Sequence, residues 1–250
     1  MTMRALTDAG RAICYASIVS YDVAHHAKDG TVAKAAKERE ELLTPLAKAF
    51  PSERAMEVTN LGIQIHGGMG FVEETGAAQF YRDARIAAIY EGTTGIQAID
   101  LVGRKLGMES GKLAYDFITE AEDLAGMLAN SGSDDLGSIG DSLGLTAAGL
   151  RETTDFMVGA MGQDPESGLT GATPYLDQFG YVAGGFYLAK SALAATGMAM
   201  SGEDEGYHRD RIAVARFYAE NLLPRANGLV SAVMAGGETL PSPESKLFAG

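Results

Sequence analysis

The sequence contains very little that would form a β-sheet or enter a membrane. Segments that alternate Val, Ile and Thr with polar residues, which are typical of strands, are missing. No run of about 18 apolar residues occurs, so we expect no membrane span. The first residues, Met1 to Arg4, lead into no apolar stretch of the kind found in a secretory signal.

Cysteine and basic residues are also scarce. The one cysteine, Cys14, cannot form an internal disulfide, and its place in an apolar helical pattern predicts a small buried side chain in the reducing cytoplasm. Asp and Glu number 33 against 20 Lys and Arg, which gives a net charge of -13. This balance argues against binding to nucleic acid or to an anionic membrane surface, because both need clustered basic side chains.

What the sequence does contain is helical periodicity. Hydrophobic residues make up 46% of 250 positions, and Ala, Leu, Met, Glu and Lys recur with helical spacing. This pattern predicts an all-α fold of up-and-down helices. The character changes after Gly107, so we expect a helical domain over 1–107 and a second helical bundle over 108–250. The expected helices cover about 5–27, 32–49, 53–65, 74–84, 94–105, 111–130, 136–161, 173–200 and 207–234.

Prolines and polar clusters predict where these helices break. Pro45 should kink or divide the second helix, and Phe50-Pro51-Ser52 should end it, with Ser52 capping the next one. Loops are expected over 163–168 and 201–206. Pro224 should bend or end the last helix, and the tail over 235–250 should be frayed.

Two histidines, His25 and His26, end the first helical pattern. Adjacent helical residues point in different directions, and neither has an obvious partner one turn away. We therefore expect histidines at a helix end and no metal site here. A carboxylate-bridged metal centre in the bundle is also unsupported, because the Glu-x-x-His pairs that such centres use are missing.

A glycine cluster follows the third helical pattern, in His66-Gly67-Gly68-Met69-Gly70-Phe71. Three glycines in four positions predict either a sharp turn or a backbone that a ligand approaches closely. By itself, a glycine run is weak evidence for phosphate binding.

One acidic residue, Glu91, stands at a hinge between two apolar helical patterns, within Ile89-Tyr90-Glu91-Gly92-Thr93-Thr94-Gly95. The Thr and Gly residues favour a break followed by a new helix capped by Thr94. The carboxylate would then lie just before a helix start, where the helix dipole favours negative charge. From this pattern alone, Glu91 is either a capping carboxylate in a solvated loop or a functional acid.

The ordered set of motifs over 61–106 resembles the C-terminal helical domain of acyl-CoA dehydrogenases. The motifs are Gln64-Ile65-His66-Gly67-Gly68-Met69-Gly70-Phe71, Arg82-Asp83-Ala84-Arg85-Ile86 and Ile89-Tyr90-Glu91-Gly92-Thr93. The segment before them looks like the preceding helices of that domain. The segment after Gly107 is similar to an extra helical module in a long bacterial branch of the family.

The resemblance implies a flavoenzyme that desaturates an acyl-CoA thioester between its α and β carbons. Glu91 matches the base that removes the α proton, a task for which burial raises a carboxylate's pKa. The cofactor would be FAD, which takes the β hydride. Tyr90 and Gly92 would flank the thioester, and Arg82 and Asp83 would form a structural ion pair.

The resemblance also implies two sets of FAD contacts. Thr93, Thr94 and Gly95 match cofactor-binding positions, and the helix start at Thr94 suits a pyrophosphate; Gly95 departs from the polar residue often found there. A second set matches a stretch that touches FAD from a neighbouring subunit. Its residues are Gln64, Ile65, His66, Gly67 and Gly68.

Full-length members of this family carry an N-terminal helical domain and a β-domain, and neither has a counterpart in the residues of this sequence. We therefore expect a fragment or a partial subunit that works as a homo-oligomer or with another chain. By resemblance, its electron acceptor is an electron-transfer flavoprotein. The alternative is a catalytically inactive helical scaffold or oligomerisation module derived from the family.

Overall fold

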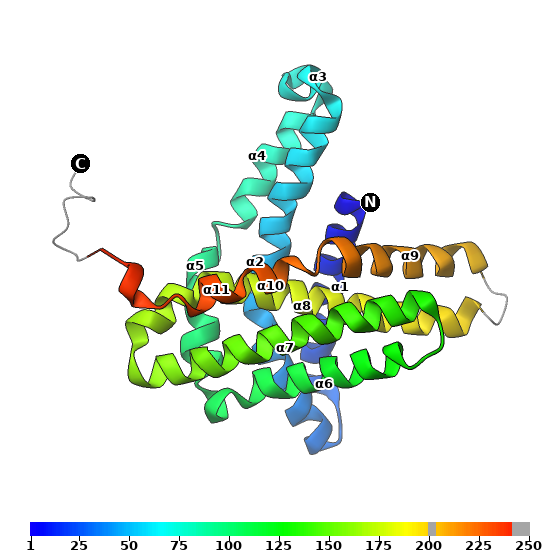
Figure 1. The fold of residues 1–250 in the computed structure, drawn as a ribbon. Coiled ribbons are helices and arrows are strands. Elements are labelled where there is room, and N and C mark those ends of the chain that lie inside the picture. Colours follow the sequence, from blue (N-terminus) through cyan, green and yellow to red (C-terminus); the bar gives the residue numbers. More distant parts are fainter. Residues whose placement is uncertain (200–203, 242–250) are drawn as a thin grey trace.

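The structure, a computed structural model, describes residues 1–199 and 204–241. Every secondary-structure element in these residues is a helix or a helical turn (Figure 1), so the all-α prediction is confirmed. None of these helices is both long and apolar enough to cross a bilayer. The elements are α1 (Thr2–His26), α2 (Gly30–His66), α3 (Gly68–Phe71), η1 (Glu73–Thr75), α4 (Ala77–Ala87), α5 (Thr94–Ile99), η2 (Asp100–Lys105), η3 (Met108–Gly111), α6 (Lys112–Ala129), α7 (Asp134–Gln163), α8 (Pro165–Ala199), α9 (Glu205–Asn221), α10 (Arg225–Gly228), α11 (Val230–Met234) and η4 (Gly237–Thr239).

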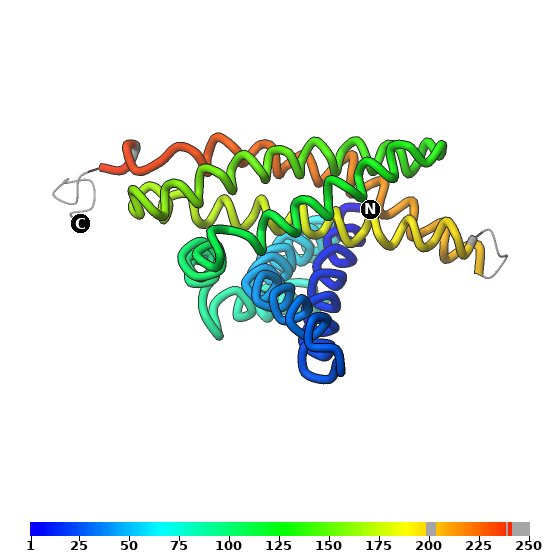
Figure 2. Tube along the Cα trace, turned by 90° about the horizontal axis from the view of Figure 1, so that it is seen from below, coloured from blue at the N-terminus to red at the C-terminus, as the bar shows by residue number. Residues whose placement is uncertain are grey.

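Helix α8 lies at the centre of the packing. It contacts α6, α7 and α9 in one layer, and α1, α2 and α5 cross its other side (Figures 1 and 2). Its buried side chains include Tyr175, Phe179, Val182 and Phe186. One hydrophobic core runs from α1 and α2 through α8 into α7 and α9. The division into domains at Gly107 therefore stays a prediction, because the two parts share this core.

Helix α2 differs from expectation because it runs unbroken through Pro45 and Pro51. Pro51 lacks an N–H and leaves the Ala47 carbonyl, four residues back, without its helical donor. The Cys14 thiol of α1 contacts this carbonyl, with Sγ 3.6 Å from the oxygen. The Ser52 hydroxyl donates back to the Lys48 carbonyl at 2.8 Å, so the prediction that Ser52 caps a new helix is wrong. The contact with α1 thus helps α2 to continue through Pro51.

Cys14 itself is half-buried rather than buried. It lines a groove of about 390 Å³ between α1 and α2, whose other walls include Gly10, Pro51 and Val58. Burial raises the pKa of the Cys14 thiol above its ordinary value, which makes the thiol a weak nucleophile.

The predicted loop over 163–168 is also wrong. Only Asp164 separates α7 from α8, and its carboxylate accepts a hydrogen bond from the Ser167 hydroxyl at 2.6 Å. Pro165 occupies the first position of α8, where a missing N–H does no harm. Pro224 does end the last long helix, since α9 stops at Asn221 and a short helix begins at Arg225. Parts of the predicted 201–206 loop and of the 235–250 tail lie outside the described residues.

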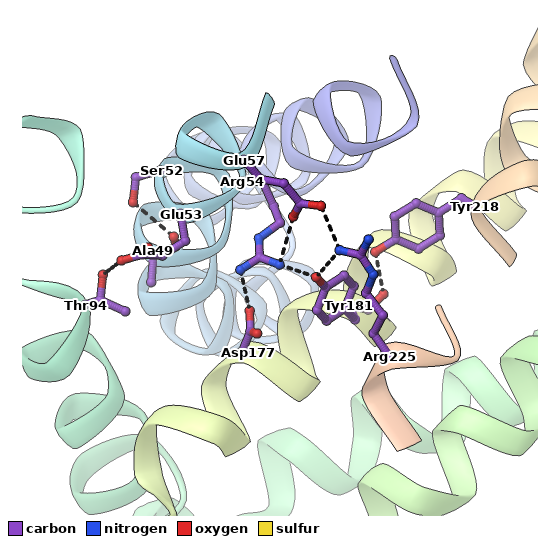
Figure 3. Close-up of polar contacts among 10 residues, drawn as sticks. All are labelled: Ala49, Ser52, Glu53, Arg54, Glu57, Thr94, Asp177, Tyr181, Tyr218 and Arg225. Carbon is purple, nitrogen blue, oxygen red and sulfur yellow. Dashed lines mark hydrogen bonds and ion pairs between the residues drawn. The ribbon is translucent and has the colours of Figure 1, made fainter. Parts of the chain in front are cut away.

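A network of charged side chains fastens α2 to α8 and α10 (Figure 3). The Arg54 guanidinium pairs with Asp177 at 3.2 Å and donates to the Tyr181 hydroxyl. Arg225 donates to Glu57 at 2.8 Å and to the same hydroxyl at 3.1 Å. Burial raises the pKa of Asp177, and the nearby Arg54 opposes that shift. Because Arg54 is only 16% exposed, this network is partly shielded from water and holds the two parts of the chain together.

The closest helix contact in this region lies at Gly180. A Cβ atom at this position would stand 2.4 Å from a ring carbon of Phe50, whose side chain is fully buried and cannot move aside. We expect Gly180→Ala to lower the free energy of unfolding by about 1–3 kcal/mol in urea denaturation. Gly126→Ala on α6 is the control, because the space there is open; it should raise stability by about 0.5–1 kcal/mol. Equal stability of the two variants would contradict the packing.

Candidate functional site

The hinge that carries Glu91 joins α4 to α5 and is built from unusual backbone conformations. Glu91 has φ of 54° and Gly92 has φ of 91°. For Gly92 this is unstrained, and a Cβ there would lie 2.8 Å from Nε2 of Gln97. For Glu91 the left-handed conformation is unfavourable, and such outliers concentrate at functional sites.

Three side chains hold this hinge in place. Thr93 Oγ1 accepts from the Ile96 N–H at 3.4 Å and caps α5, one residue earlier than the predicted cap at Thr94. The Thr94 hydroxyl instead donates to the Glu53 carboxylate of α2 (Figure 3). Gln97 Nε2 donates to the Glu91 carbonyl at 3.3 Å. The backbone on the C-terminal side of Glu91 is therefore tied to α5, and α5 to α2.

The Glu91 side chain is exposed, and Tyr90 beside it is 52% exposed. The chain by itself therefore does not build the dry pocket expected around the carboxylate. Its described residues fix the backbone that follows Glu91 and leave the side chain exposed.

The glycine turn lies at the other end of α4 from the hinge (Figure 1). With 11 residues, α4 is about 16 Å long. Within one chain, the structure thus does not bring Gln64, Ile65, His66, Gly67 and Gly68 together with the Glu91 hinge. All five are exposed at the tip of the molecule. This separation is compatible with the implied contact to a cofactor in a neighbouring subunit.

Glycine is required at different positions of this turn for different structural reasons. Gly67 has φ of 61°, which favours glycine, and a Cβ at Gly70 would stand 2.3 Å from the Ile63 carbonyl oxygen. At Gly68 and at Gly95 near the hinge, nothing in this chain is closer than ordinary contact distance. The described structure therefore explains Gly67 and Gly70 but gives no reason for Gly68 or Gly95.

Arg82 makes a different ion pair from the one predicted. Its guanidinium binds the Glu73 carboxylate with two bonds of 3.0 and 2.7 Å, and Asp83 is not the partner. Residues 82 and 83 are adjacent on α4 and point apart, whereas η1 folds Glu73 back over the helix. The pair joins η1 to α4 near the glycine turn and does not reach the Glu91 hinge.

Sequence reasoning missed a set of exposed apolar side chains at the tip, on α4 and on α5. Phe71 is 82% exposed and Phe80 is 72% exposed. Helical spacing of apolar residues on more than one side of α4 was the available signal, because a helix with one buried face needs a single apolar stripe. Exposed apolar patches of this kind mark sites of contact. The exposed apolar side chains of this region are Ile65, Met69, Phe71, Phe80, Tyr81, Ile86, Ile89, Tyr90, Ile96 and Ile99.

The histidine pair occupies the end of α1, as predicted. His25 Nδ1 lies 2.8 Å from the Tyr21 carbonyl and His26 Nδ1 lies 2.8 Å from that of Asp22. Among the residues that the structure describes, no group of three or more His, Cys, Asp or Glu side chains is arranged to hold a metal ion.

Family models account for nearly the whole chain. Residues 1–106 match the model described as acyl-CoA dehydrogenase, C-terminal domain, and residues 116–242 match one described as acetyl-CoA dehydrogenase C-terminal like. The chain belongs to the acyl-CoA dehydrogenase family.

Curated acyl-CoA dehydrogenases are similar over almost all of this chain. The 3-methylmercaptopropionyl-CoA dehydrogenase of Ruegeria pomeroyi is 41% identical over 240 residues, which is 96% of this chain and 40% of that protein. A butyryl-CoA dehydrogenase of Syntrophomonas wolfei is 28% identical over 247 residues, again 96% of this chain and 40% of the relative. The chain thus spans about 40% of the length of these curated relatives.

Solved acyl-CoA dehydrogenase structures share the fold. ACDH-11 of Caenorhabditis elegans, solved in complex with C11-CoA, aligns with a TM-score of 0.69 at 19% identity, over 88% of this chain and 35% of that one. An acyl-CoA dehydrogenase of Bacillus anthracis complexed with FAD aligns with a TM-score of 0.53 at 21% identity, over 93% of this chain and 40% of that one.

The left-handed conformation of Glu91 leads to a stability test in this acyl-CoA dehydrogenase chain. Glu91→Gly should raise the free energy of unfolding by up to about 1 kcal/mol, because glycine adopts this conformation without strain. Glu74→Gly applies the same change to an exposed glutamate with negative φ, and should lower stability by about 0.5–1 kcal/mol. Urea denaturation measures both, and a destabilised Glu91→Gly variant would show that the hinge is not strained.

Proposed function

We propose that this chain supplies the C-terminal helical part of an FAD-dependent acyl-CoA dehydrogenase, in which Glu91 removes the α proton of an acyl-CoA thioester. The observation that carries the proposal is the Glu91 hinge of this family member. A carboxylate stands there on a left-handed residue whose following backbone is fixed by Thr93, Thr94 and Gln97.

The chemistry needs a base held at one place and direction. The carbon beside a thioester is weakly acidic, so proton removal depends on a well-oriented carboxylate of suitable pKa. Glu91 would accept the proton on a carboxylate oxygen, with Tyr90 and Gly92 flanking the thioester. Bound FAD would supply the acceptor for the β hydride. An electron-transfer flavoprotein would then take the electrons.

Two separate patches of this chain fit contacts with FAD. The first is the exposed end of α2, where the Gln64, Ile65 and Gly67 region is open and Gly68 leaves room for close approach. The second is the hinge, where the Thr93 hydroxyl accepts a capping bond and its hydrogen is still free to donate. The first patch would meet the cofactor of a neighbouring copy, as the resemblance implies, and the protein would then be a homo-oligomer.

An inactive scaffold is the second candidate, and the exposure of Glu91 favours it. The Glu91 carboxylate is not enclosed in a dry pocket by this chain, and the chain covers only about 40% of the length of its curated relatives. The enzyme assembled from this chain and the remainder of its relatives' length separates the candidates: bound yellow flavin with dye reduction by acyl-CoA supports the enzyme, and colourless, inactive protein supports the scaffold. A colourless, inactive chain on its own is expected for either a scaffold or a fragment.

Replacing the proposed base tests the first candidate directly. In the flavin-loaded enzyme that contains this chain and the remainder of its relatives' length, Glu91→Gln should lower kcat about 10²- to 10⁴-fold, because the amide cannot accept the proton. Flavin content and acyl-CoA binding should be unchanged. Glu74→Gln, at an exposed glutamate of the same segment, is the matched control and should keep full activity. Unchanged turnover in Glu91→Gln would rule out its role.

The unexplained glycines test the FAD contacts. Gly68→Ala and Gly95→Ala should leave the unfolding midpoint of this chain unchanged or raised, because the added methyl groups meet nothing closer than 3.9 Å. If the flavin approaches these backbones, each change should weaken FAD binding about tenfold in fluorescence titration of the assembled enzyme. Gly126→Ala provides the control, and equal FAD affinity in all three variants would remove both contacts.

A further inference from the structure

The Thr94 hydroxyl, which the resemblance assigns to FAD, has another partner in this structure. It donates to the Glu53 carboxylate, a bond between residues 41 positions apart that joins α5 to the middle of α2. Both side chains are half-buried. Hydrogen bonds to a carboxylate acceptor are among the stronger ones in proteins.

The turn of α2 that carries Glu53 is itself held in position. Glu53 points toward Thr94 of α5, while its neighbour Arg54 points toward Asp177 and Tyr181 of α8 (Figure 3). Burial of Ser52 and its bonds to preceding carbonyls fix the same turn from within. Glu53 is therefore a hydrogen-bond acceptor on a helix that is fixed against α8. A shift of α5 would break its bond to Thr94.

We infer that Glu53 is a positioning residue, which aims the Glu91 carboxylate by holding the Thr94 hydroxyl at the start of α5. Thr94 lies three positions after Glu91, and the Gln97 side chain of α5 donates to the Glu91 carbonyl. Fixing α5 thus fixes the backbone that directs Glu91. This inference rests on the proposed function for its catalytic consequence, but its structural part concerns this chain's own residues.

The structural part is measured on the 250-residue chain by hydrogen–deuterium exchange of the α5 amides. Glu53→Ala and Thr94→Val should each speed exchange over 94–102 about tenfold. In the double variant, the second substitution should add much less than a further tenfold, because the hydrogen bond is already lost. Glu53→Gln and Thr94→Ser keep an acceptor oxygen and a hydroxyl, and should restore slow exchange. Thr59→Val, which removes only bonds of the hydroxyl to carbonyls within α2, is the control and should leave exchange in α5 unchanged.

The catalytic part is measured in the assembled, flavin-loaded enzyme. Glu53→Ala should lower kcat about 10- to 100-fold with little change in KM or flavin content, because a misdirected base slows proton removal without removing a binding contact. Glu53→Gln should recover most of the turnover. A merely structural role would lower the unfolding midpoint without this split between kcat and KM.

The outcomes separate this inference from the proposed function. Unchanged α5 exchange in Glu53→Ala overturns the inference, even if Glu91→Gln is inactive. Loss of flavin from Thr94→Val with slow α5 exchange also overturns it, because Thr94 would then serve the cofactor. Fast exchange in Glu53→Ala together with a fully active Glu91→Gln keeps the hinge bond but removes Glu91 as the base.

Discussion

The close approach of α8 to α2 is the contact on which the rest of this structure depends. Phe50 of α2 faces Gly180 of α8 with no room for a Cβ, and next to it the Arg54 guanidinium is held by Asp177 and Tyr181. Removing one partner of such a shielded charge network leaves the other without compensation. Because α2 also bears the acceptor for the hinge and ends in the glycine turn, the position of α2 on α8 decides where both candidate patches lie.

Helix periodicity made the all-α class and most helices predictable, because apolar spacing reports which face is buried. The errors arose where a distant or capping contact overrides a local rule. Pro51 would end an isolated helix, but Cys14 of α1 contacts the carbonyl that it leaves free. The polar run after Gln163 looks like a loop, but Asp164 alone makes the connection by capping α8. Neither contact could be predicted from spacing along the chain.

For the site, the sequence supplied the residue types but not their surroundings. The hinge was predicted at Glu91, yet neither its positive φ nor the bond from Thr94 to Glu53 could be predicted, because each depends on how α5 packs on α2. The sequence also cannot tell which glycines the fold requires. Gly67 and Gly68 look alike in sequence, whereas only the backbone of Gly67 needs glycine in this chain. A residue with no structural reason in the chain is the better candidate for contact with something outside it.

A carboxylate that acts as a base must be held in a fixed direction and must be shielded from water, and these are separate requirements. Bonds inside the chain fix the backbone that follows Glu91, while its side chain is exposed. The described residues of one chain do not exclude water from this carboxylate. The apolar side chains around the hinge, among them Ile89 and Ile96, are exposed as well. Under the proposed function, a partner surface that covered these side chains together with Glu91 would couple association to exclusion of water from the base.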